Sequence, residues 1–240
     1  MNSSKKSILN SNFTYLAAFV LPVIMMMALY YTRGIFPWGN ECYLRSDMYH
    51  QYAPFFSELW HKIRNGESLT YSWNIGMGTN FTSLFAYYLA SPSNWFVALF
   101  PQKYTIEIMN AFIILKIAGS SLSLTYYLTK HNNNKHVIAA IFGMFYGMSG
   151  FIAAYSWNIM WLDGMIMLPL IVLGIERIFN KGDIKLYTLS MILLFFANYY
   201  MGYMSCIFAV IYFVAYFIIS YKNDCLLYTS DAADDLTRVD

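Results

Sequence analysis

The stretch Phe13–Thr32, FTYLAAFVLPVIMMMALYYT, holds twenty residues, none of them charged. A helix of about 20 mostly apolar residues crosses the ~30 Å hydrocarbon core of a bilayer. A cleaved signal peptide has an apolar region of only ~7–15 residues and a small-residue cleavage site, and this stretch fits neither feature. We therefore expect an uncleaved membrane-spanning helix, preceded by Lys5 and Lys6.

The composition extends this prediction to the whole chain. Of 240 residues, 58% are hydrophobic and only 12% charged, and the mean hydropathy is +0.43. Soluble domains average about 25% charged residues, so this chain has too few charges to cover a water-facing surface. An aromatic content of 20% excludes a disordered coil. The three cysteines lack paired spacing, which indicates neither a disulfide framework nor a zinc site.

Five more apolar segments follow the first, at residues 105–128, 137–155, 164–179, 186–198 and 203–220. They predict an all-α fold, a polytopic transmembrane helical bundle with a long outer loop over residues 33–104. Pro22 and Pro169 fall inside spans, where neighbouring helices can satisfy the freed carbonyls. A net charge of +2 gives no reason to expect a nucleic-acid partner.

The basic residues favour a cytoplasmic N-terminus. This orientation places eight of them inside: Lys5, Lys6, Lys130, Lys135, Arg177, Lys181, Lys185 and Lys222. The short outer loops, residues 156–163 and 199–202, then contain no Lys or Arg. Loops longer than about 60 residues are largely exempt from the rule, so the basic residues of the long loop do not count against it.

The long loop predicts a short amphipathic helix after Pro54, capped near Gly66. The apolar face of this helix carries Tyr52, Phe55, Phe56, Leu59, Trp60 and Ile63 at helical spacing. The opposite face carries Ser57, Glu58, His61, Lys62 and Arg64, and the helix could lie in the plane of the lipid headgroups. Residues 81–101 are apolar but are split by Ser91-Pro92-Ser93-Asn94, which favours a re-entrant or interfacial pair over a span.

Asp47 is the first candidate for chemistry, in Ser46-Asp47-Met48-Tyr49-His50-Gln51-Tyr52. A carboxylate among aromatic residues can be desolvated enough to act as a base near neutral pH. The alternative is that Asp47 caps a turn or helix. His50 is a second candidate for catalysis or phosphate binding, and the alternative is that it is an ordinary solvated histidine of the loop. Arg45, Lys62 and Arg64 could bind a phosphate headgroup, or they could simply face lipid and water.

Ionisable residues at membrane depth are costly and are functional candidates by default. Asp163 lies at the outer end of the fourth span, where it could also be wetted beside Trp157 and Trp161. Lys116 needs a partner or a water-filled cavity, and Glu107 is too far along the same helix to be that partner. We expect Glu176 and Arg177, at the inner end of the fourth span, to serve topology.

The last residues, 225–240, read CLLYTSDAADDLTRVD and contain much of the chain's acidic charge. They resemble a translated sequencing-adapter tail, although a real acidic tail is the alternative. We expect this stretch to be non-native and the natural protein to continue beyond residue 224.

Three motifs of the outer loop resemble the bacterial YfhO membrane-protein family. They are residues 47–52, then Trp73-Asn74 with Gly76 and Gly78, then residues 87–94. The later stretches 161–176 and 198–203 resemble the same family, so the resemblance covers roughly residues 13–222. The joint order of these motifs is more specific than any one of them.

The resemblance implies a glycosyltransferase of the GT-C type, in the bacterial cell membrane. Such enzymes are similar in using a polyprenyl-phosphate sugar on the outer face, with short juxtamembrane helices next to a first-loop acid. YfhO proteins are associated with adding sugars, hexosyl or N-acetylhexosaminyl groups, to teichoic acid or related envelope polymers. Family members are longer than this chain, so we expect the fragment by itself to be inactive.

We predict Asp47 as the base, with His50 as a catalytic partner near the phosphate. The predicted substrate-binding residues are Arg45, Tyr49, Gln51, Trp73, Asn74, Tyr88, Asn158 and Asp163. No resident metal ligands are assigned and no cofactor is certain, although Asp163 could position a divalent metal. The alternatives are a lipid-linked sugar flippase or transporter, and a membrane protein that binds envelope polymers without turnover.

Overall fold

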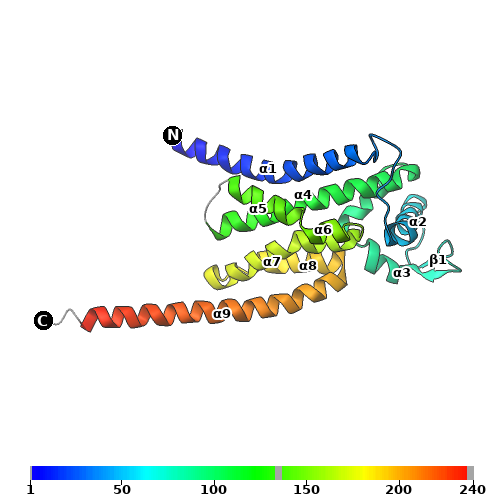
Figure 1. The fold of residues 1–240 in the computed structure, drawn as a ribbon. Helices are drawn as coiled ribbons and strands as arrows, with labels where there is room; N and C mark the ends of the chain where they lie inside the picture. Colours follow the sequence, from blue (N-terminus) through cyan, green and yellow to red (C-terminus); the bar gives the residue numbers. More distant parts are fainter. Residues whose placement is uncertain (1, 133–136, 237–240) are drawn as a thin grey trace.

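The computed structural model describes the backbone of residues 2–132 and 137–236, and side chains within residues 12–132 and 137–220. The helices of the apolar segments form a single bundle, in which the chain passes back and forth (Figure 1). They are α1 (Asn2–Thr32), α4 (Thr105–His131), α5 (Val137–Gly147), α6 (Gly150–Tyr155), α7 (Leu162–Lys181), α8 (Lys185–Ala197) and α9 (Tyr199–Leu236). The all-α polytopic bundle predicted from the sequence is confirmed.

Small and hydroxyl-bearing residues bring α1, α4 and α5 close together. The Ser121 hydroxyl of α4 donates a hydrogen bond of 2.6 Å to the Ala18 carbonyl of α1. On α5, a Cβ at Gly143 or Gly147 would collide with the backbone of α4. Within a membrane, close backbone approach and interhelical hydrogen bonds replace the hydrophobic effect as the source of helix association. The residue types of α4 therefore place it at the centre of the bundle.

Five of the described helical stretches are long and apolar enough to cross a membrane. They are Asn12–Thr32, Gln102–His131, Val137–Tyr155, Ile159–Lys181 and Tyr199–Ser220. The third is broken at Met148 and Ser149, between α5 and α6. The segment expected at 186–198 forms α8, which has 13 residues. At 1.5 Å per residue, α8 is only about 20 Å long.

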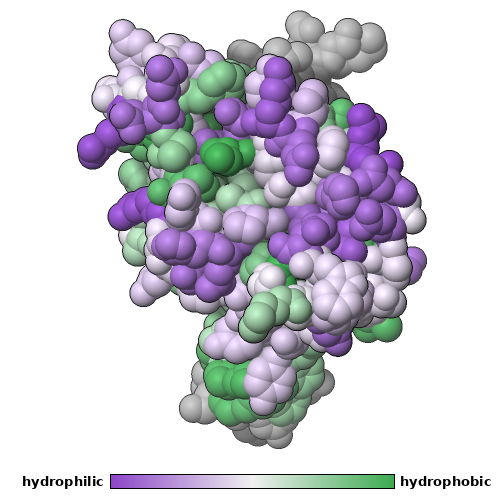
Figure 2. All heavy atoms as spheres, turned by 90° about the vertical axis from the view of Figure 1, so that its right-hand side faces the viewer, coloured by the Kyte–Doolittle hydropathy of each residue, from purple (hydrophilic) through white to green (hydrophobic). Residues whose placement is uncertain are grey.

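A small polar region caps the end of the bundle that holds the first loop (Figure 1). Its elements are η1 (Met48–Tyr52), α2 (Ala53–Asn65), β1 (Tyr71–Ser72), β2 (Thr79–Asn80), α3 (Phe81–Leu84), η2 (Phe85–Leu89), η3 (Pro92–Leu99) and η4 (Gln102–Tyr104). Viewed end-on, this region is rich in hydrophilic residues, with apolar patches between them (Figure 2). Residues 81–101 form short helical pieces and do not cross the bundle, as the Ser91-Pro92 interruption predicted.

Helix α2 begins with Pro54 in its first turn and ends at Gly66, whose φ of 65° supplies a left-handed cap. Phe56 and Leu59 on its apolar face are fully buried. The opposite face is not uniformly exposed, because Glu58 and Lys62 are only 6% and 3% exposed.

The β1–β2 hairpin accounts for this burial. Ser72 donates a hydrogen bond of 2.6 Å to Glu58, and Asn74 donates one of 3.0 Å to the other carboxylate oxygen. The Lys62 ammonium donates to the carbonyls of Ser68 and Tyr71. The hairpin therefore covers the charged face of α2 and satisfies it, a tertiary contact that helical periodicity does not encode.

Residues 81–101, called the re-entrant segment below, pack on the C-terminal end of the short helix α8. Asn198, at the junction of α8 and α9, is fully buried and donates a hydrogen bond of 2.7 Å to the Tyr87 carbonyl in η2. The same side chain accepts a bond of 2.8 Å from the Met201 amide in the first turn of α9. Element η2 thereby occupies the space that α8 does not reach.

The contact between α7 and α8 depends on Gly174, and this dependence is testable. A Cβ at Gly174 would lie 2.6 Å from the Tyr187 nitrogen, so Gly174→Ala must push the helices apart. We expect a loss of roughly 1–3 kcal/mol in unfolding free energy, measured by thermal unfolding in detergent. Gly150→Ala is the control, because a Cβ there meets nothing within 4 Å. Equal stability of the two variants would contradict this account of the α7–α8 contact.

Candidate functional site

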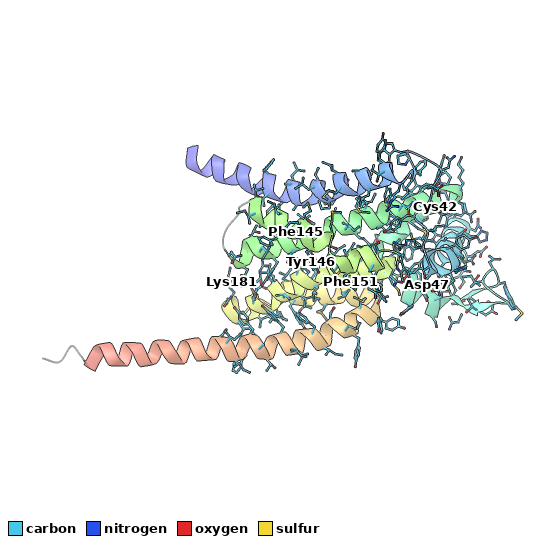
Figure 3. The ribbon with its side chains drawn as sticks, viewed as in Figure 1. Cys42, Asp47, Phe145, Tyr146, Phe151 and Lys181 are labelled. Carbon is cyan, nitrogen blue, oxygen red and sulfur yellow. The ribbon has the colours of Figure 1, made fainter. Side chains whose placement is uncertain are left out.

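Asp47 lies in a turn at the end of the bundle that holds the first loop (Figure 3). The Met48 amide donates to the Arg45 carbonyl at 2.9 Å, and Ser46 adopts a left-handed φ of 47°. Such a conformation is strained for a residue with a side chain, and strain of this kind clusters at functional sites. Asp47 precedes η1, but its side chain makes no capping hydrogen bond. The interpretation of Asp47 as a cap is therefore not supported.

A wall of tyrosines stands beside Asp47. Tyr52 and Tyr88 meet edge to face, with ring centroids 5.3 Å apart, and Tyr87 and Tyr88 do the same at 4.8 Å. Burial raises the pKa of Tyr52, and the nearby Tyr88, Tyr87 and Asp47 raise it further. The pKa of Tyr88 is raised by burial first, then by Tyr87 and Asp47. Both hydroxyls therefore stay protonated and act as hydrogen-bond donors near the half-buried carboxylate of Asp47.

Hydrogen bonds connect this wall to other predicted site residues. The Tyr88 hydroxyl donates to Gln51 Oε1 at 2.8 Å, and the Tyr52 hydroxyl donates to Asn158 Oδ1 at 3.1 Å. Tyr52 was not among the predicted site residues, although it is fully buried and links η1 to the segment before α7. The structure thus links Gln51 to Tyr88 and Asn158 to Tyr52, the two tyrosines whose electrostatic neighbour is Asp47.

His50 and Tyr49 face a different side of the same turn. Both line a hollow of about 550 Å³ together with Pro54 and Lys103. His50 also borders a neighbouring hollow of about 470 Å³, where Asn74, Glu58 and His61 lie.

Trp73 stands beyond these hollows on the β1–β2 hairpin, 77% exposed, with its ring centroid 4.8 Å from that of Tyr71. Arg45 faces a third space, beside α1. The predicted site residues therefore divide between the tyrosine wall, the outer hollows and the α1 side.

A buried ion pair occupies the space under the re-entrant segment. The Lys116 ammonium lies 2.7 Å from Asp163 Oδ2, and the side chains are 4% and 11% exposed. Lys116 also donates to the Ser91 hydroxyl at 3.4 Å and to the Ile159 carbonyl at 3.3 Å. The partner that Lys116 needed is thus Asp163. The bond to Lys116 uses Oδ2 of Asp163. The predicted contact of Asp163 with substrate or metal would therefore involve its other oxygen, Oδ1.

The opposite end of the bundle holds a second polar cluster, centred on Glu176. Its carboxylate is 4% exposed and accepts hydrogen bonds from Tyr127 and Tyr212 at 2.9 Å each. His131 Nδ1 lies 2.8 Å from the other oxygen. The expectation that Glu176 serves only topology was incomplete, because the residue joins α4, α7 and α9. A buried acid near three potential donors cannot be foreseen when the donors lie 36 to 49 residues away.

Within the described ranges, no three His, Cys, Asp or Glu side chains gather closely enough to hold a metal ion. A divalent metal at Asp163 stays a prediction. The acids that do lie close to one another in the outer region, such as Glu58 and Glu67, are both engaged with Lys62.

The family model described as "Bacterial membrane protein YfhO" matches residues 17–232 of the chain. That range includes nearly the whole chain. The chain belongs to the YfhO family of bacterial membrane proteins. No curated protein and no solved structure matches it. Family membership and the long apolar helices together establish a multi-pass membrane protein, and the match spans the tyrosine wall and the buried ion pair of this YfhO-family chain.

The Lys116–Asp163 pair predicts a non-additive mutant cycle. Lys116→Met leaves a buried carboxylate without its partner, which should cost about 3–5 kcal/mol of stability. Asp163→Leu should be similarly costly, because it leaves the ammonium alone. The double variant removes both charges and should be more stable than either single variant. Thermal unfolding of all four proteins in detergent measures the coupling, and additive losses would show that the pair is not coupled.

Proposed function

We propose that this YfhO-family chain belongs to a membrane glycosyltransferase acting on the outer face of the bacterial membrane. The donor is a sugar carried on polyprenyl phosphate, and the acceptor is a cell-envelope polymer such as teichoic acid. The observation that carries the proposal is the position of Asp47. Its half-buried carboxylate makes no capping hydrogen bond and lies in a strained turn, beside a tyrosine wall at the outer end of the bundle.

The chemistry follows from this position. An acceptor hydroxyl attacks the anomeric carbon of the sugar and gives up its proton to the Asp47 carboxylate. The bond between that carbon and the phosphate oxygen breaks, and the lipid phosphate leaves with the electron pair. A general base must lie within hydrogen-bond reach of the hydroxyl whose proton it takes. The Tyr88 and Gln51 pair, joined at 2.8 Å, offers hydrogen bonds to sugar hydroxyls.

The hollows near His50 suit the polymer side of the reaction. Both open outward and share His50, Pro54, Ser57 and Gln102. Polar side chains with an exposed aromatic ring nearby, here Trp73, are the kind of surface that contacts a hydrated chain of sugars or polyols. In this proposal, the polymer approaches over the hollows and presents its hydroxyl toward Asp47.

The flippase alternative has less support. It would need charged residues along a path between the helices, and Lys116 was one of two candidates. Lys116 is instead held by Asp163, Ser91 and the Ile159 carbonyl. These contacts hold the Lys116 side chain in place, so Lys116 has a structural role and does not line a transport path.

The orientation with a cytoplasmic N-terminus is part of the proposal and predicts the labelling of a native cysteine. Cys42 is exposed in the long loop, near Asp47 (Figure 3). A membrane-impermeant maleimide added to intact cells should label the chain, and Cys42→Ser should abolish the labelling. Permeabilised cells provide the positive control. If Cys42 reacts only after permeabilisation, the loop is cytoplasmic and the proposed face is wrong.

Asp47→Asn tests the base. Loss of a general base lowers a rate by about 100-fold or more, so sugar transfer should fall by at least this factor while the amount of protein in the membrane is unchanged. The assay is made with the full-length protein. Labelled polyprenyl-phosphate sugar is the donor.

Glu41→Gln is the matched control, since Glu41 is an exposed acid of the same loop. It should retain transfer. Undiminished transfer by Asp47→Asn would remove Asp47 from the mechanism, whereas equal losses in both variants would point to a general effect of loop charge.

A further inference from the structure

A cavity of about 330 Å³ opens between the outer ends of α1, α5 and α6. Its inner lining is apolar and comes from Met26, Leu29, Ile117, Met148 and Ile152. The volume is near the lower limit of ligand pockets, which is about 300 Å³. A space of this size, at the outer end of apolar helices, admits part of one hydrocarbon chain more readily than two.

The rim of this cavity is cationic. Arg33, just after α1, and Arg45, two residues before Asp47, both line it and are exposed. No described carboxylate lies within ion-pair distance of either guanidinium. Arginine binds phosphate through paired N–H groups, and two unpaired arginines at one opening form a strong site for a doubly charged phosphate.

The cavity wall also contains an unsatisfied hydroxyl. Tyr30 is 2% exposed and lines the cavity, and its buried hydroxyl has no hydrogen-bond partner among the described residues. Leaving a buried donor unpaired costs about 1–3 kcal/mol. The neighbouring Tyr43 ring stacks on Tyr30, while the Tyr43 hydroxyl is paired with Ser156 at 2.6 Å. A ligand oxygen entering beside Tyr30 would supply the missing acceptor after a small adjustment of the ring.

We propose that this cavity binds the phosphate end of a single-chain polyprenyl phosphate. Arg33 and Arg45 hold the phosphate, and the first part of the chain lies along the apolar lining between α1 and α6. The inference rests on the proposed function, and it locates the lipid phosphate, which is the leaving group of the proposed sugar transfer. A phosphate monoester carries about −1.5 to −2 charges at pH 7, whereas the sugar-bearing diester carries about one. The two arginines therefore bind the phosphate more strongly as its bond to the sugar breaks, which is the differential binding that catalysis requires.

The experiment measures binding of a labelled polyprenyl monophosphate to the chain in phosphatidylcholine nanodiscs. Wild type should bind saturably, and Arg33→Gln/Arg45→Gln should weaken binding about tenfold or more. Arg64→Gln removes an outer cation away from the cavity and should bind like wild type. Ala153→Leu fills the cavity without changing charge and should also weaken binding. Its matched control is Ala154→Leu, because Ala154 follows on the same helix but does not line the cavity.

Equal affinity in all variants would overturn the assignment and indicate attraction by the surface in general. Competition by phosphatidylglycerol or inorganic phosphate as strong as that by unlabelled polyprenyl monophosphate would also overturn it. Intact binding of Ala153→Leu would exclude the cavity as the place of the chain. The assay contains neither sugar nor acceptor, so its outcome is independent of whether Asp47 acts as a base, and failure of either idea is recognised separately.

Discussion

The ion pair between Lys116 and Asp163 connects three parts of the chain at a depth where neither charge would be stable alone. Removing charges from water costs several kcal/mol for each ion, so the pair exists only because its geometry is close and the remaining donor capacity of Lys116 is used. That capacity goes to Ser91 and the Ile159 carbonyl. The re-entrant segment, the centre of α4 and the start of α7 are therefore positioned together, and the tyrosine wall is built on this joint.

At both ends of the bundle, buried charged side chains form hydrogen bonds with a neighbouring element. On the outer side, Glu58 and Lys62 are buried because the β1–β2 hairpin supplies every hydrogen bond that they make outside α2. On the other side, Glu176 is buried because tyrosines from α4 and α9 donate to it. Both clusters use a charged residue to fix where a neighbouring element packs. Specific pairing of this kind is directional, and apolar contact with lipid-like side chains is not.

Much of the architecture follows from the sequence because it depends on local properties. The twenty uncharged residues of Phe13–Thr32 predict a helix, Ser91-Pro92 predicts a break, and Pro54 and Gly66 predict the limits of α2. Motif order also led to the right family. The site was less predictable, because its contacts are long-range: Tyr52 reaches Asn158 across 106 residues, and Lys116 reaches Asp163 across 47. Helical spacing identifies faces but not the partner of each face, which is why neither the burial of Glu58 and Lys62 nor the role of Tyr52 was predicted.

The short helix α8 has a consequence for the surrounding bilayer. Its 13 residues extend about 20 Å, roughly 10 Å less than the hydrocarbon thickness. Such hydrophobic mismatch is relieved where lipids thin locally or polar chain takes the place of the absent turns. Here Asn198 and the carbonyl of Tyr87 provide polar groups at one end of α8, beside the tyrosine wall. Under the proposed function, a water-soluble polymer and a membrane-anchored carrier would meet at this place.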